Sequence, residues 1–206
     1  MDFERFEEIP DDTYEIVYAD PPWLYYGDPN KDAAAGKHYI QMDDEALAKL
    51  PVRKKMKKRS VLFMWGTCPR LDAAIDLFRA WDLYFRGVSF IWTKTRRDGG
   101  IIGAQGPRPS IVKPTAELVL VGSPMRKGRP LPVLDEKVAQ SVLAPRRKHS
   151  EKPEEVRRRI DRLYGPHHRR IELFARGAPV RFWDRFGNQM DPETPSALDL
   201  VNEKTS

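Results

Sequence analysis

The stretch YEIVYADPPW, residues 14–23, joins an apolar run to an acid, two prolines and a tryptophan. Its first six residues are mostly apolar or aromatic, which is typical of a strand buried in a parallel sheet. A residue that precedes proline is restricted to extended conformations, so Asp20 and Pro21 are both stiffened, and neither Pro21 nor Pro22 has an N–H to donate. The sequence therefore predicts a core strand that ends in a rigid cluster of hydrogen-bond acceptors.

Further apolar runs, rich in valine, isoleucine, phenylalanine and tryptophan, predict buried strands over residues 60–65, 87–94, 117–122 and 170–175. Helical periodicity predicts helices over residues 43–50, 69–81 and 152–165, the last with Pro153 in its first turn and Gly165 as its stop. Strands that alternate with helices indicate an α/β fold, with a mostly parallel sheet covered on both faces. In doubly wound sheets, ligands bind outside the carboxyl ends of the strands, where the segment after residue 19 opens.

The 206 residues suffice for one domain with a well-buried core, and we expect a single domain over residues 1–190 and a polar, flexible tail over residues 191–206. No apolar run reaches the roughly 18 residues needed to span a bilayer, and the N-terminus lacks the pattern of a signal peptide, so a cytoplasmic protein is expected. The one cysteine, Cys68, cannot form an internal disulfide, and four histidines without paired cysteines give no metal-ligand spacing.

The chain has 36 lysines and arginines against 30 aspartates and glutamates, a formal net charge of +6. A basic surface attracts polyanions, so nucleic acid is a plausible partner, although many basic proteins bind none. The densest basic run, residues 53–59, either contacts phosphate or is only solvated surface. The glycine- and proline-rich segment 98–114 carries Arg108 and Lys113 and is the better candidate for recognition of a nucleic-acid strand.

The acceptors around Asp20 suit one chemical group, the exocyclic amine of a nucleobase. That amine has two N–H donors, and its lone pair is delocalised into the ring. Two acceptors that hold both hydrogens direct the lone pair at an electrophile and stabilise developing positive charge, and loss of one such preorganised partner commonly costs about 10²- to 10³-fold in rate. Trp23 could stack on a base turned out of its helix. The alternative is that residues 20–23 only end a strand and cover a core.

Three segments, YADPPW (18–23), residues 61–94 and residues 147–189, resemble in that order the MT-A family of S-adenosylmethionine-dependent adenine N6-methyltransferases. The resemblance covers residues 14–190. It implies a Rossmann-like doubly wound methyltransferase fold with permuted motifs, in which the catalytic motif precedes the cofactor motif. It also implies S-adenosylmethionine as cofactor and nucleic acid as substrate.

The resemblance assigns roles to individual residues. Asp20, Pro21, Pro22 and Trp23 match the catalytic tetrapeptide and would hold the target amine. Lys152 matches the lysine that pairs with the cofactor's carboxylate. The remaining matches are Glu172, Phe174, Arg176, Asn188 and Gln189 for the cofactor and Tyr39, near the target base. The glycine-rich signature of many methyltransferases is reduced here to Gly177.

Three hypotheses about the substrate and role stay open at this point. Similarity to short phage and bacterial members favours methylation of adenine N6 in DNA. RNA is the alternative, because the residues that bind the base do not contact the sugar 2′-hydroxyl, which distinguishes RNA from DNA. A non-catalytic nucleic-acid-binding partner is the third, although such a protein need not keep residues 20–23 intact. A homodimer or a partner subunit is also expected, since so short a chain has little room for a separate recognition domain.

Overall fold

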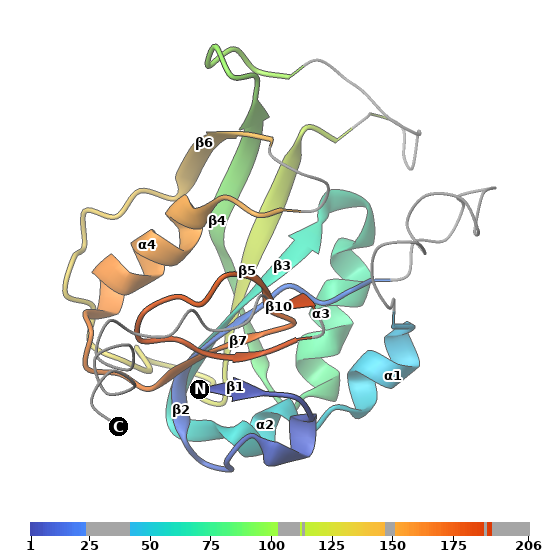
Figure 1. Ribbon diagram of the computed structural model, residues 1–206, viewed down its shortest axis with the longest axis vertical. Helices are drawn as coiled ribbons and strands as arrows, with labels where there is room; N and C mark the ends of the chain where they lie inside the picture. Colours follow the sequence, from blue (N-terminus) through green and yellow to red (C-terminus); the bar gives the residue numbers. More distant parts are fainter. Residues whose placement is uncertain (24–41, 103–111, 113, 147–150, 188, 191–206) are drawn as a thin grey trace, which may run out of the picture.

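The computed structural model of the protein describes residues 1–23, 42–102, 112, 114–146, 151–187 and 189–190 (Figure 1). Within them, an eight-stranded sheet has the order β1-β9-β7-β2-β3-β5-β4-β6. Its strands are β1 (Asp2–Phe3), β2 (Tyr14–Ala19), β3 (Met56–Thr67), β4 (Tyr84–Thr95), β5 (Ala116–Ser123), β6 (Ser141–Pro145), β7 (Arg170–Leu173) and β9 (Asp184–Phe186). Two further strands, β8 (Arg176–Gly177) and β10 (Gln189–Met190), pair with each other.

Neighbouring strands of the large sheet are parallel except around β5, which is antiparallel to both β3 and β4. The prediction of a mostly parallel α/β sheet is therefore confirmed. The five predicted strands correspond to β2, β3, β4, β5 and β7. The helices and 3-10 turns are η1 (Phe6–Glu8), α1 (Asp44–Lys49), α2 (Val52–Lys55), η2 (Cys68–Arg70), α3 (Leu71–Ala80) and α4 (Glu154–Tyr164).

Two hydrophobic cores form, one on each face of the sheet. Successive side chains of a strand point to opposite faces, so along β3 Leu62 and Met64 join one core while Phe63 and Trp65 join the other. The first core also takes in buried residues of α1 and α3, and the second takes in those of α4. Figure 1 shows α4 on the opposite side of the sheet from α1 and α3. Both faces are thus covered, as predicted.

Helix α4 follows Pro153 and ends at Gly165, whose φ of +66° lies in the left-handed region that glycine adopts without strain. The end agrees with the prediction, whereas Pro153, predicted in the first turn, has an extended backbone and caps a helix that begins at Glu154. Among the described helices, none combines the length and the apolar character needed to cross a bilayer. The tail over residues 191–206 lies outside the described residues, so the predicted division of the chain stays a prediction.

One close contact between helix and sheet gives a test of the first core. A Cβ atom added to Gly122 of β5 would lie 2.4 Å from Cδ1 of Phe78 on α3 and 3.2 Å from the carbonyl oxygen of Tyr84. Because overpacking forces neighbouring groups to shift, we expect Gly122→Ala to lower the free energy of unfolding by about 1–3 kcal/mol in urea denaturation. Gly66→Ala is the matched control: its nearest neighbour is Ala74 Cβ, at 3.4 Å. Equal losses in the two variants would contradict this account.

Candidate active site

The carboxyl ends of the central parallel strands meet at one edge of the sheet, and the candidate site lies there. Asp20 directly follows β2, and its main-chain N–H donates to the carbonyl of Leu173, the last residue of β7, at 3.4 Å. Thr67, the last residue of β3, is opposite Glu117 at the start of the antiparallel β5. Asp20 thus lies at the carboxyl ends of the strands, as predicted, and ligand binding there stays a prediction.

The segment Asp20–Trp23 has a buried, internally bonded backbone. Both prolines are buried. The carbonyl of Pro21 accepts from the main-chain N–H of Trp23 at 2.9 Å, and that of Pro22 accepts from the N–H of Met42 at 3.0 Å. Each prolyl carbonyl thus uses one of its two lone pairs, and the Asp20 carboxylate is the strongest acceptor of the segment because it is charged.

Trp23 is packed more tightly than the sequence suggested. Its side chain is 6% exposed and belongs to the core formed with α1 and α3. The guanidinium of Arg70 lies over the indole, 5.6 Å from the ring centroid, and pairs with Asp44 at the start of α1. A base could stack on this face of Trp23 only after Arg70 moves, so base stacking stays a prediction.

Four charged side chains of alternating sign line up at this edge; we call them the charged row. Nζ of Lys94, on β4, lies 2.6 Å from Oε1 of Glu117. Nζ of Lys152, two residues before α4, lies 3.4 Å from Oε2 of Glu117 and 3.0 Å from Oδ1 of Asp20. The four side chains are between 15% and 22% exposed. Lys152, predicted to bind the cofactor's carboxylate, therefore pairs in this structure with Asp20, which is predicted to be catalytic.

The two lysines of the charged row lie over two tryptophans. Nζ of Lys152 is 5.5 Å from a ring centroid of Trp65, and Nζ of Lys94 is 5.2 Å from that of Trp92. The two indoles meet edge to face, with centroids 6.0 Å apart. Trp65 is fixed in turn by donating its Nε1–H to the hydroxyl of Tyr18, at 2.5 Å. Both lysines thus make cation–π contacts with a packed pair of indole rings, which favour the positive charge of the ammonium groups.

Glu117 is a site residue that the sequence analysis missed. Burial acts to raise the pKa of its carboxyl, but Lys152 and Lys94 together outweigh burial and hold the pKa below its usual value. Glu117 is therefore an anion at neutral pH. In the sequence, Glu117 is the first residue of an apolar run that predicts a strand. An acid that borders such a run, as Asp20 also does, is the pattern that would have identified it.

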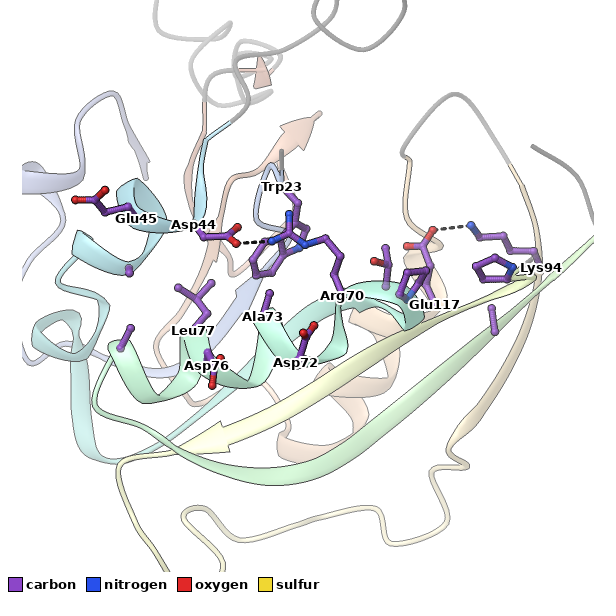
Figure 2. A pocket seen from close by; sticks show the side chains of 16 residues that line it. Trp23, Asp44, Glu45, Arg70, Asp72, Ala73, Asp76, Leu77, Lys94 and Glu117 are labelled. Carbon is purple, nitrogen blue, oxygen red and sulfur yellow. Dashed lines mark hydrogen bonds and ion pairs between the residues drawn. The ribbon is translucent and has the colours of Figure 1, made fainter. Parts of the chain in front are cut away.

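A cavity of about 890 Å³ opens between α1, α3 and the ends of β3, β4 and β5 (Figure 2). Acidic residues of α1 and α3 contribute to its lining: Asp44, Glu45, Asp72 and Asp76. Its lining also includes Trp23, Thr67, Arg70, Lys94 and Glu117. A cavity of this size accommodates a nucleotide or a drug-sized ligand.

Two of the predicted cofactor residues lie in or directly after β7, and a third lies in β8. Glu172 is buried and pairs with Arg157 of α4 at 2.9 Å; burial raises the pKa of this carboxyl above its usual value. Phe174 has a φ of +61°, a strained conformation for a residue other than glycine. Arg176 of β8 is in register with Gln189 of β10, so the structure brings these two predicted cofactor residues together.

The remaining predicted residues, Tyr39, Arg108, Lys113 and Asn188, lie outside the described residues, as does the side chain of Gln189. The basic run 53–59 covers α2 and the start of β3. Lys55 is buried there, where it donates to the carbonyl of Ile9 at 2.6 Å and pairs with Asp11 at 2.7 Å. At about 3.3 Å per residue, Lys58 is on the order of 30 Å along β3 from the candidate site. This run does not border the site.

The sheet, with an Asp-Pro-Pro-Trp segment at its carboxyl edge, has the features of a Rossmann-like methyltransferase. The family model for MT-A70 matches residues 14–189. The chain is also 30% identical over 219 residues to the type II methyltransferase M.MunI of a Mycoplasma species, a match that covers 95% of this chain and 88% of that protein. The chain belongs to the MT-A70 family of methyltransferases, and the resemblance drawn from its sequence is confirmed.

Proposed function

We propose that this protein transfers the methyl group of S-adenosylmethionine to N6 of adenine in DNA. The observation that carries the proposal is the Asp20 carboxylate, which already holds an ammonium N–H donor, that of Lys152, at 3.0 Å. Membership of the MT-A70 family supports methyl transfer. A relative designated a type II methyltransferase favours DNA.

The residues present fit S-adenosylmethionine at its charged end. Lys152 is a largely buried cation directly before the N-terminus of α4, where unpaired main-chain N–H groups also favour an anion. It would bind the cofactor's carboxylate. Around the end of β7, the proposed cofactor contacts are Glu172, Phe174, Arg176, Asn188 and Gln189. When bound, S-adenosylmethionine supplies a methyl group attached to a positively charged sulfur.

The protein's part in the reaction is to hold and orient the amine. Asp20 accepts a hydrogen bond from N6, directs the lone pair and stabilises the positive charge that develops on nitrogen. Pro21 and Pro22 keep the carboxylate in place because their backbone is restricted and buried. Tyr39 is proposed near the target base, and Arg108 and Lys113 on the nucleic-acid strand. A cytoplasmic location, and a homodimer or partner subunit, are also proposed from the sequence.

The test is transfer of labelled methyl from S-adenosylmethionine to duplex DNA, single-stranded DNA and RNA, each of mixed sequence. We expect N6-methyladenine in DNA after digestion and mass spectrometry. If N6-methyladenine forms in RNA alone, the proposed substrate is RNA and not DNA. If N4-methylcytosine forms instead, the proposed target base is wrong. If no substrate is labelled and calorimetry shows no binding of S-adenosylmethionine, the protein is a non-catalytic partner instead.

A further inference from the structure

The side chain of Arg70 covers the Trp23 ring at the large cavity. Arg70 is the last residue of η2 and directly precedes α3. Its guanidinium carbon lies 5.6 Å from the Trp23 ring centroid, and its Nη2 pairs with Oδ2 of Asp44, the first residue of α1. All three residues line the cavity, and Figure 2 shows Arg70 beside the indole with its guanidinium directed at Asp44. In the structure, this face of Trp23 is therefore occupied by a cation.

Asp44 is an incompletely satisfied partner for this guanidinium. Its Oδ1 atom is buried and has no hydrogen-bond partner among the residues that the structure describes. The Asp44 side chain as a whole is 46% exposed, so solvent weakens the ion pair and can hydrate the carboxylate once Arg70 leaves. A phosphate offers two oxygens to the fork of guanidinium N–H groups, and such a bidentate contact is stronger than a pair through one oxygen. A phosphate can therefore displace Asp44 from Arg70.

The charges around the cavity give Arg70 a specific part in binding a nucleic acid. A target base within a strand arrives with a phosphate on each side, and the acidic lining of the cavity repels both. Lys94 lies 2.6 Å from Glu117 in the charged row, so its charge is already used there. Arg70 is the described lining cation outside the charged row, and it is the one placed to meet a phosphate. The charged lining residues are Asp44, Glu45, Asp72, Asp76 and Glu117, against Arg70 and Lys94.

We propose that Arg70 binds a backbone phosphate of the substrate strand and leaves Asp44 and Trp23 to do so. The proposal deepens the proposed function and rests on it. A single movement of the side chain then neutralises a phosphate at the cavity and uncovers a face of Trp23, a residue that is 6% exposed in the structure. A nucleoside without phosphate provides no such exchange, so Arg70 makes the site selective for bases carried on a phosphate backbone.

The first test is Asp44→Asn, which removes the charge that competes with phosphate for Arg70 and keeps the size of the side chain. On the polymer that the wild-type protein methylates, we expect KM for the nucleic acid to fall about two- to fivefold, the strength of a partly exposed ion pair, with kcat unchanged. Asp72→Asn is the matched control: Asp72 lines the same cavity from the first turn of α3, and within the described part of the chain Arg70 pairs with Asp44 and not with Asp72. A KM for Asp44→Asn no lower than that of Asp72→Asn would overturn the proposal.

The second test is the salt dependence of binding in Arg70→Met, measured by fluorescence anisotropy with a labelled duplex and a labelled single strand. Loss of one phosphate contact should lower the slope of log Kd against log salt concentration by about 0.9 for the duplex and about 0.7 for the single strand. Arg70→Lys keeps the charge, so its slope should stay near the wild-type value. Arg79→Met is the matched control, an exposed arginine of α3 that pairs with Asp76. Equal slopes in Arg70→Met and Arg79→Met would overturn the proposal, whether or not Asp44→Asn folds.

A double-mutant cycle joins the two tests. In the Arg70→Met background, Asp44 has no guanidinium to hold, so Asp44→Asn should lower KM no more than Asp72→Asn does. If Asp44→Asn lowers KM equally with and without Arg70, Asp44 acts only by repelling phosphate, and the exchange is wrong. Failure of the wild-type protein to methylate any nucleic acid would instead reject the proposed function.

Discussion

Asp20→Asn is expected to lower kcat for methyl transfer by about 10²- to 10³-fold, since it removes the charge that stabilises the developing positive nitrogen. The side chain keeps its shape, so the fold should be unchanged in circular dichroism. The measurement is a single-turnover rate with labelled S-adenosylmethionine on the preferred substrate.

Cofactor binding separates this prediction from general damage. Asp20 pairs with Lys152, so loss of the Asp20 charge leaves Lys152 freer to meet a carboxylate. The Kd for S-adenosylmethionine in Asp20→Asn should therefore stay equal to or fall below the wild-type value in calorimetry. A kcat within threefold of wild type would contradict the role given to Asp20. A higher Kd for S-adenosylmethionine would contradict the competition between Asp20 and the cofactor's carboxylate for Lys152.

Lys152→Met is expected to raise the Kd for S-adenosylmethionine by about 10- to 100-fold, the worth of a hydrogen bond to a charged group. The variant also leaves Asp20 without this ammonium and leaves Glu117 with Lys94. The two carboxylates then repel each other, so the free energy of unfolding should fall as well. Calorimetry measures the first effect and urea denaturation the second.

A conservative variant controls for this change. Lys152→Arg keeps the positive charge, so its affinity should lie between those of wild type and Lys152→Met. Arginine is longer and planar, which prevents full recovery in a site shaped for an ammonium. Unchanged cofactor affinity in Lys152→Met would show that the carboxylate is bound elsewhere.

The elements that the sequence predicted share one property: each carries a repeated local signal. The strand β2 and the helices α3 and α4 have six, ten and eleven residues and bury many apolar side chains. Their apolar patterns are therefore long enough to predict the element from the sequence. The strands β6 and β9 and the helix α2 have five, three and four residues and were not predicted. Segments of that length are too short to establish a period, and pairing with neighbouring strands decides their structure. The four-residue β7 was predicted because its apolar run extends to residue 175.

The candidate site divides in the same way. Asp20 was predicted because the stiffened segment Asp20–Trp23 has a local signature. The charged row was not, because it joins residues from four separate segments of the chain, and the register that sets Thr67 opposite Glu117 is a tertiary property. Arg70 over Trp23 is a similar case, since no local pattern connects the start of α3 with the end of β2.

The ion pairs of Lys152 also bear on selectivity. Two carboxylates that face one space attract any small cation, including the free amines of a cell. Lys152 is a tethered competitor for that space, held there by the chain itself, and short tethers correspond to effective concentrations in the millimolar range. A soluble amine at lower concentration is outcompeted, whereas a ligand whose own carboxylate binds Lys152 removes the competitor. The ion pairs of Lys152 with Asp20 and Glu117 thus keep the space closed to stray cations as long as they hold.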